Sequence, residues 1–177
     1  MNIFYLDHDP VKCAMYHGDK HCVKMILESA QLLSSAHRVL DGNEITKKTA
    51  NNRTMTTYSH PDPTRESELY KMTHRNHPCA IWSRETSENY KWLVSLTDAL
   101  IDEYRFRYGK DHAVLAKMPL LRQLPNNIKV GDFTQPAQAM PDAYRVDGDS
   151  QSAYREYYRN DKKAMFAWKN RNRPEWL

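Results

Sequence analysis

The sequence has few of the features that mark membrane, secreted or disulfide-bonded proteins. None of its 177 residues lies in an apolar run of eighteen or more, so we expect no membrane span. The first ten residues contain neither a basic region nor a long apolar stretch, which predicts no secretory signal and a cytoplasmic location. The three cysteines are odd in number and lack CxxC spacing. This argues against structural disulfides and thiolate zinc sites and favours reduced, packed thiols.

Motifs for nucleotide binding and nucleophilic catalysis are also missing. Neither GxGxxG nor GxxxxGK(S/T) occurs, which argues against kinases and dinucleotide-dependent oxidoreductases. There is no GxSxG elbow and no cysteine-protease signature. We therefore expect no cofactor. With only five glycines and almost no period-two alternation, the sequence predicts an all-α single domain, residues 1–177, of about four to six helices with long irregular connections.

Residues 19–40 carry the clearest pattern in the chain. Five polar side chains spaced three and four apart form one stripe on a helix: His21, Lys24, Glu28, Gln31 and Ser35. Nearly all other positions are apolar, so we expect a helix that is buried on most sides, capped by Asp19 and ended at Gly42. The stripe then faces either an internal hydrogen-bond network or the floor of an active site.

The other elements follow from capping residues and helical spacing. Asp9 and Pro10 predict the start of a short helix. Residues 78–108 predict a helical region with a break near Glu85, a cap at Thr86 or Ser87 and a stop at Gly109. Residues 43–65 have no apolar periodicity and predict a long polar loop. Ser150 starts a last helix that runs to about residue 168.

The net charge of +4 is modest, but basic and aromatic residues alternate in the last 25 positions. Cations that contact phosphates and aromatic rings that stack on bases are what a nucleic-acid surface needs. The alternative is a terminal amphipathic helix with a solvated basic face. The candidate DNA contacts here are Arg155, Arg159, Lys162, Lys163 and Trp168.

A metal site is a second possibility. His17 and His21 are four residues apart and Glu28 follows seven later, so together with Asp19 they offer nitrogen and oxygen ligands, with help from His74 or His77. Gly18 interrupts the helix between the two histidines, and the pattern matches no standard motif such as HExxH. This alternative corresponds to a metal-dependent hydrolase of nucleotides or nucleic acid.

The same helix carries a resemblance to a known family. The run DKH at residues 19–21, followed by Glu28, resembles the Asp-x-His and Glu of pyrimidine-dimer DNA glycosylases of the phage endonuclease V type. Residues 75–78 are similar to an Asn-His-Pro element in bacterial relatives of that family. Residues 157–158 and 174–176 are similar to its aromatic, basic C-terminal segment.

The resemblance implies a small helical fold, DNA as the partner and an amine nucleophile. In the family the attacking group is the α-amine of a small Thr exposed when Met is removed; here that residue is Asn2, and Met1 or Lys24 is the alternative nucleophile. Glu28 would protonate or stabilise the sugar and then assist strand cleavage by β-elimination. Further DNA contacts would come from His21, Arg75, His77 and Arg84. The sequence thus predicts a DNA glycosylase with AP-lyase activity, with a non-catalytic nucleic-acid-binding module as the other alternative.

Overall fold

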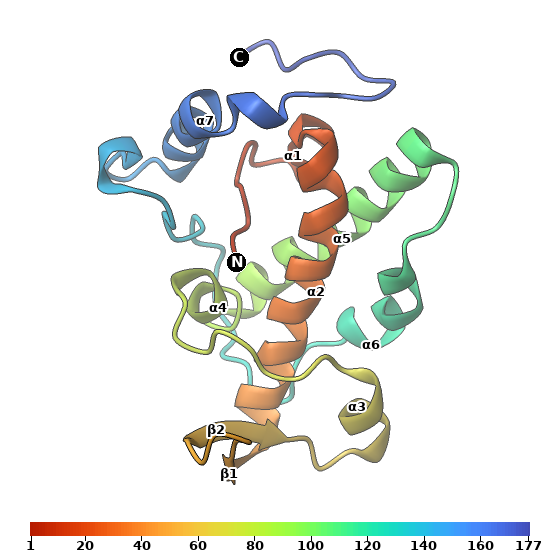
Figure 1. Cartoon of the computed structure of the whole chain (residues 1–177), viewed down its shortest axis with the longest axis vertical. Coiled ribbons are helices and arrows are strands. Elements are labelled where there is room, and N and C mark those ends of the chain that lie inside the picture. The colour runs from red at the N-terminus through yellow and green to blue at the C-terminus, as the bar shows by residue number, and fades with distance from the viewer.

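The computed structural model describes residues 1–177, and two long helices form its centre (Figure 1). Helix α2 (Asp19–Asp41) runs through the middle of the molecule, and α5 (Ser87–Tyr108) crosses and packs against it. With 23 residues, α2 is about 35 Å long. No helix of the chain is long and apolar enough to cross a membrane.

Shorter elements surround this pair. The remaining α-helices are α1 (Pro10–Tyr16), α3 (Pro63–Glu68), α4 (Pro78–Trp82), α6 (Met118–Leu121) and α7 (Ser150–Asp161). Short 3-10 helices lie at Ala113–Lys117, Asp142–Tyr144 and Lys163–Met165. The two strands are β1 (Asn43–Lys48) and β2 (Thr54–Ser59). The prediction of a mostly helical chain is therefore confirmed, but the prediction of an all-α fold is wrong.

The β-hairpin replaces part of the predicted polar loop at residues 43–65. β1 and β2 pair antiparallel, from Asn43 opposite Ser59 to Lys48 opposite Thr54. Threonine is frequent in β2, and β-branched residues suit a pleated strand. Only Tyr58 of the hairpin is buried, so both faces are mostly polar. Because both faces are polar, the sequence of the hairpin lacks the alternation of apolar and polar residues by which strands are recognised.

Arg38 connects the hairpin to the core. Its side chain is 2% exposed, and its guanidinium donates to the backbone carbonyls of Tyr58, Leu69 and Tyr70 at 2.8–3.2 Å. It also forms an ion pair with the carboxylate of Glu66. A buried guanidinium is tolerated only when its donors are paired in this way. The C-terminal end of α2 is thus joined to both β2 and the segment after α3.

Helix ends follow the sequence signals at several places. The Asp9 carboxylate caps α1 with Pro10 in its first turn, and the Thr86 hydroxyl caps α5. Gly109 ends α5 in the left-handed conformation, at φ 67°. The prediction that Asp19 caps α2 is wrong, because Gly18 occupies the N-cap position and makes no side-chain bond.

The C-terminal segment turns back onto the start of α2. α7 ends at Asp161, so the prediction of a helix to about residue 168 is wrong. The carbonyl of Ala167 accepts a hydrogen bond from the Asp19 amide at 2.8 Å, and the Trp168 indole donates to the Tyr16 carbonyl at 3.1 Å. These bonds satisfy backbone groups at the α1–α2 junction, and they draw the chain away from the α7 axis.

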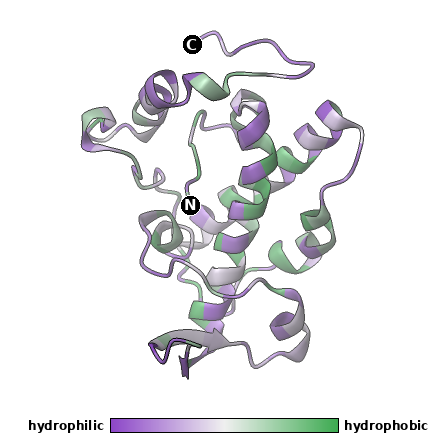
Figure 2. Cartoon of the chain, in the orientation of Figure 1, coloured by the Kyte–Doolittle hydropathy of each residue, from purple (hydrophilic) through white to green (hydrophobic).

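Burial of α2 differs between its two halves. All residues from Leu32 to Arg38 are buried, whereas Val23, Lys24 and Leu27 in the first half are exposed. Figure 2 shows the mixture of apolar and polar residues along this helix. The expectation of burial on most sides therefore holds only for the C-terminal half. All three cysteines are free and buried, which confirms the prediction of packed thiols.

The N-terminal segment threads beside α2 in an extended form (Figure 1). Residues from Ile3 to Leu6 are buried, and Phe4 has a φ of 53°, in the left-handed region. That conformation costs about 1–2 kcal/mol for a residue with a side chain. Burial of Ile3 or Leu6 alone contributes about 1.5–3 kcal/mol, so packing offsets the strain. This segment positions the amino terminus against the middle of α2.

Candidate functional site

A pocket of about 480 Å³ opens where the N-terminal segment, α2 and α7 meet. Its lining residues are Met1, Asn2, Phe4, Lys20, His21, Lys24, Glu28, Ala139, Tyr157, Lys162 and Met165. Three members of the polar stripe on α2, His21, Lys24 and Glu28, line this pocket. The remaining two, Gln31 and Ser35, lie further along the helix, and the Ser35 hydroxyl bonds to the backbone of Thr73.

Glu28 lies at the amino terminus of the chain. Its Oε2 accepts a hydrogen bond from the Asn2 amide at 3.1 Å and is 3.9 Å from the Met1 α-amine. Its Oε1 is 3.2 Å from the Lys24 ammonium. The Glu28 side chain is 13% exposed and that of Lys24 is 65% exposed, so the carboxylate lies within the pocket and the lysine at its mouth. Carboxylate and amine are close enough to exchange a proton through one water or a small movement.

His21 forms the inner wall of the pocket. Tyr158 Oη accepts a hydrogen bond from the Gly18 amide at 2.8 Å and lies 2.8 Å from His21 Nδ1, so its proton goes to the histidine. The imidazole also stacks on Phe4 with ring centroids 4.3 Å apart. Burial, assisted by nearby positive charges, lowers the pKa of His21 to about 3. His21 is therefore a neutral imidazole that carries its proton on Nε2.

The pocket is basic and partly aromatic. Lys20 and Lys162 line it together with Lys24, which gives three cations against one carboxylate. The Lys162 ammonium donates to Tyr157 Oη at 2.9 Å and lies 4.3 Å from the centre of that ring. The Tyr157 ring is nearly parallel to Phe4, with centroids 6.1 Å apart. Such a pocket suits an anionic ligand with a flat apolar part.

His77 lies near this pocket, at the start of α4. Its Nδ1 accepts a hydrogen bond from the Cys79 amide at 3.2 Å and caps the helix. Burial, with a smaller contribution from the positive amino terminus, lowers the pKa of His77. The histidine is thus linked electrostatically to the Met1 amine and Glu28.

Several of the predicted DNA contacts have hydrogen-bond partners within the chain. Arg84 donates to the carbonyls of Ala80 and Arg75 at 2.7 and 2.8 Å, and Arg75 pairs with Glu44 at 3.2 Å. The Trp168 indole is held by Tyr16, as described above. Arg84 and Trp168 therefore stabilise the fold, while Arg75 remains 43% exposed.

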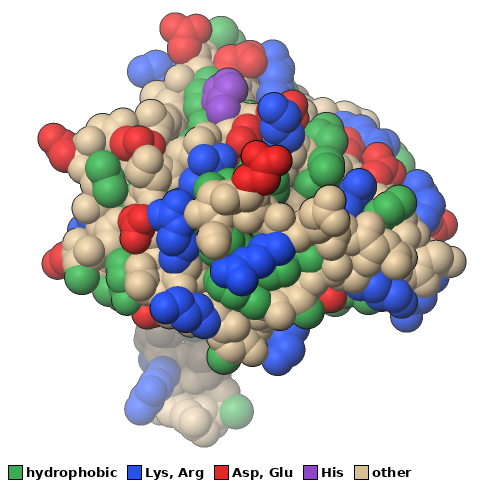
Figure 3. All heavy atoms as spheres, turned by 90° about the horizontal axis from the view of Figure 1, so that it is seen from above, with side chains coloured by type: hydrophobic (Ala, Val, Ile, Leu, Met, Phe, Trp, Pro, Cys, Tyr) green, Lys and Arg blue, Asp and Glu red, His purple; other side chains and the backbone are tan.

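The two arginines of α7 have internal partners as well. Arg155 donates to the Leu6 carbonyl at 2.8 Å and pairs with Asp7 at 3.1 Å. Arg159 donates to the Trp176 carbonyl at 2.7 Å and pairs with Glu156. Lys163 is exposed and forms no ion pair. Figure 3 shows this end of the molecule, where basic side chains lie among acidic and apolar ones.

The alternative metal site is not assembled. His17 Nδ1 bonds to the Cys13 carbonyl at 2.7 Å, and the ligand atoms of His17, His21 and Glu28 do not all lie within 4.8 Å of one another. The Asp19 carboxylate instead accepts hydrogen bonds from Arg107 and from the Lys169 amide at 2.9 and 3.0 Å.

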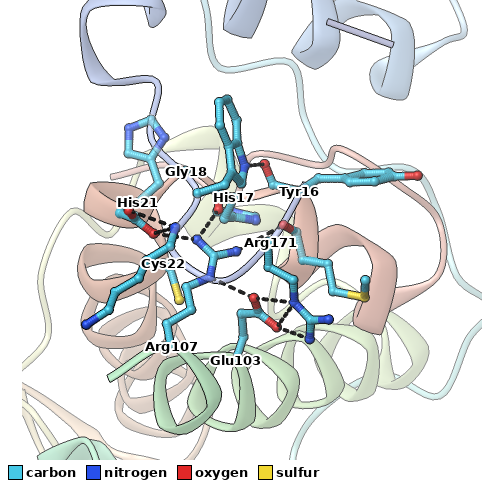
Figure 4. Close-up of polar contacts among 12 residues, drawn as sticks. Tyr16, His17, Gly18, His21, Cys22, Glu103, Arg107 and Arg171 are labelled. Carbon is cyan, nitrogen blue, oxygen red and sulfur yellow. Dashed lines mark hydrogen bonds and ion pairs between the residues drawn. The ribbon is translucent and has the colours of Figure 1, made fainter. Parts of the chain in front are cut away.

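A buried ion network lies at the α1–α2 junction, where the chain enters α2 (Figure 4). The Arg107 guanidinium is 1% exposed and donates to Glu103 at 2.7 Å and to the carbonyls of Met15 and His17 at 3.0 and 2.9 Å. Arg171 from the C-terminal tail binds the same Glu103 carboxylate at 2.9 Å. The network thereby joins α5, the α1–α2 junction and the tail.

Sequence reasoning did not find this network. The only signal was an i, i+4 pair of opposite charges inside the helical pattern of residues 87–108, and that spacing is common on solvated helix faces. It also overlooked Phe4, Lys20 and Tyr157 as pocket residues. Lys20 was within the quoted DKH run, and Tyr157 within the aromatic segment, but neither pattern specifies which way a side chain faces.

Comparisons with family models, with curated proteins and with solved structures find no match to this chain.

Proposed function

We propose that the chain is a DNA base-excision enzyme, a glycosylase with AP-lyase activity, whose reaction takes place in the pocket at Glu28. The observation that carries this proposal is the position of the amino terminus. The Met1 amine is 3.9 Å and the Asn2 nitrogen 3.1 Å from the same carboxylate oxygen. A chain that begins at either residue therefore has its α-amine beside Glu28.

The amine has the right chemistry for this reaction. α-Amines ordinarily have a pKa of about 8, so a usable fraction is unprotonated near neutral pH. The unprotonated amine attacks C1′ of the target nucleotide, the C1′–base bond breaks, and the base leaves with the bonding electrons and takes up a proton. The attacking nitrogen passes its extra proton to Glu28, Glu28 passes it to the ring oxygen O4′, and opening of the sugar leaves a protonated Schiff base between C1′ and the amine.

Strand cleavage follows from the same pair of groups. Once the Schiff base has formed, the Glu28 carboxylate removes a proton from C2′, and the 3′ phosphate departs by β-elimination. Water then hydrolyses the imine and releases the amine. Lys24 lies 3.2 Å from the other oxygen of Glu28, where its positive charge faces the carboxylate.

The pocket lining supports a nucleotide as the ligand. Lys20, Lys24 and Lys162 supply cations for phosphates, and Phe4 and Tyr157 supply ring surfaces for a base or sugar. Chemistry at C1′ requires the nucleotide to leave the base stack, and the pocket is open to solvent on the side of Lys24. His21, neutral and protonated on Nε2, can donate a hydrogen bond to the ligand.

Borohydride trapping on a duplex with an abasic site tests the proposal. We expect a covalent protein–DNA adduct with the wild-type chain, whose attachment point is the first residue found by intact mass measurement. Glu28→Gln should lower strand cleavage by about 10²–10⁴-fold, the usual contribution of a general acid–base group. Glu88→Gln, at an exposed position on α5, is the matched control and should cleave like the wild type.

Two outcomes contradict the proposal. Absence of any adduct from a chain with a free α-amine on Met1 or Asn2 refutes the amine mechanism. Wild-type activity in Glu28→Gln refutes the role of the carboxylate. If both occur while DNA binding weakens steeply with salt, the chain is a nucleic-acid-binding module without this chemistry.

A further inference from the structure

A second cluster of functional side chains lies at the other end of α2. His37, Asp41 and His60 each offer a metal-ligand atom, and these three atoms all lie within 4.8 Å of one another. It is the only group of three or more His, Cys, Asp or Glu side chains in the chain with that property. His37 lies nine residues beyond Glu28 on α2, about 13 Å along the helix axis, so this cluster is separate from the candidate active site.

One ring nitrogen of His37 has no hydrogen-bond partner. Tyr90 Oη donates its only proton to the Leu121 carbonyl at 2.8 Å, so it accepts the bond that joins it to His37 Nε2 at 2.9 Å. His37 therefore carries its proton on Nε2 and a lone pair on Nδ1. Nδ1 is buried without a partner and is 4.0 Å from Asp41 Oδ2. A lone pair that faces a carboxylate is unfavourable unless a proton or a cation lies between them.

Asp41 and His60 complete the cluster. The Asp41 side chain is 4% exposed, and its oxygens accept from the Asn126 and Asn127 amides at 2.8 and 2.9 Å, which fixes the carboxylate in place. His60 follows β2; its Nε2 is buried and has no partner. Two imidazoles that are at least nine-tenths buried thus each have an unpaired nitrogen, and one ligand atom of each ring lies within 4.8 Å of the same carboxylate.

We propose that His37 Nδ1, Asp41 Oδ2 and His60 Nε2 bind one divalent transition-metal ion, with zinc as the best fit. Neutral imidazoles and a carboxylate are the ligands that zinc accepts in tetrahedral sites, and the fourth position goes to water. Bonds of about 2.1 Å place tetrahedral ligands about 3.4 Å apart, so the 4.0 Å between His37 and Asp41 needs only a small contraction. The His37–Tyr90–Leu121 chain is the outer hydrogen bond that orients a metal-bound histidine.

Binding requires one rearrangement at His60. Its Nδ1 accepts from the Asp62 amide at 3.1 Å, which places the proton of the metal-free ring on Nε2. Metal binding at Nε2 moves the ring proton to Nδ1, and this replaces the hydrogen bond that Nδ1 accepts from the Asp62 amide. The ion would link the C-terminal end of α2 to His60, directly after β2.

Zinc titration of the untagged chain tests the proposal. After exhaustive chelation and return of zinc, we expect one ion per chain by elemental analysis. The melting temperature should rise by about 5–10 °C when free zinc exceeds Kd about 100-fold. Cobalt in place of zinc should give the intense visible absorption of four-coordinate Co²⁺. Magnesium should have no such effect, since it prefers six oxygen ligands.

A pair of histidine variants separates this site from adventitious binding. His60→Gln should weaken zinc binding at least about tenfold, because it removes a direct ligand. His8→Gln, at an exposed histidine, should bind as the wild type does. An equal loss of zinc affinity in both variants, or less than about 0.2 zinc ions per wild-type chain, overturns the proposal. A buried water is then the occupant of the cluster. If His60→Gln does not fold, the cobalt measurement on the wild type decides. Absence of the four-coordinate Co²⁺ spectrum then overturns the proposal.

Discussion

Replacement of Arg107 by methionine tests how much the buried ion network at the α1–α2 junction stabilises the fold. Methionine preserves much of the side-chain volume and removes all the donors. In the variant, the carbonyls of Met15 and His17 lose the guanidinium bonds, while Glu103 keeps Arg171 and Asp19 keeps the Lys169 amide. The change thus leaves two carbonyls without these partners and a buried carboxylate with one cation instead of two.

The expected effect is large compared with the stability of a single domain. Removal of one partner from a buried ion pair costs about 3–5 kcal/mol, and most natural domains unfold with about 5–15 kcal/mol. For a chain of this size, each kcal/mol lowers the melting temperature by about 2–4 °C. We therefore expect Arg107→Met to melt about 6–20 °C below the wild type.

Thermal and urea unfolding, followed by circular dichroism, measure this difference. Arg122→Met is the control, because Arg122 also pairs with a carboxylate, that of Asp98, but both side chains are partly exposed. Its loss should amount to less than about 1 kcal/mol. If Arg107→Met unfolds within 1 kcal/mol of the control (about the resolution of the urea measurement), the network does not stabilise the fold as argued.

Three further predictions concern pH, packing and thiol reactivity. Burial lowers the pKa of His17 to about 4 and that of His21 to about 3, whereas both are near 6.5 when unfolded. The unfolded chain therefore binds more protons as the pH falls, and these two histidines should lower stability by about 2–3 kcal/mol between pH 7.5 and 5.5, to which His37, whose pKa burial lowers to about 4, adds about 1 kcal/mol; a flat urea-unfolding profile would contradict this. Gly42→Ala should destabilise by about 1–3 kcal/mol in the same assay, because its Cβ would lie 2.3 Å from the Arg38 carbonyl oxygen. Gly18→Ala, with nothing nearer than 3.4 Å, is its control, and equal losses would refute the packing argument. The three cysteines are buried and have raised pKa values, so a thiol reagent at pH 8 should label them only in denaturant, and rapid labelling of the native chain would show that they are accessible.

The sequence by itself determined the main helices and one side of the pocket. Capping signals at Asp9, Thr86 and Gly109 are local, because a helix end depends on residues within one turn. The polar stripe on α2 is also local, and it places His21, Lys24 and Glu28 on one face of the helix whatever surrounds it.

Tertiary structure decided what faces that stripe. The N-terminal segment carries no periodic pattern, and its path beside α2 is set by burial of Ile3 and Leu6 against residues far along the chain. That path alone places the Met1 amine 3.9 Å from Glu28. The hairpin, polar on both faces, is likewise held by Arg38 and not by its own pattern.

The histidine cluster shows the same division. The spacing of His37 and Asp41, four residues apart at the end of α2, was visible in the sequence, but His60 reaches them only because the hairpin folds back. Short-range spacing fixes which side chains share a helix face. Contacts between segments separated by tens of residues fix what those side chains meet, and they depend on packing of the whole chain.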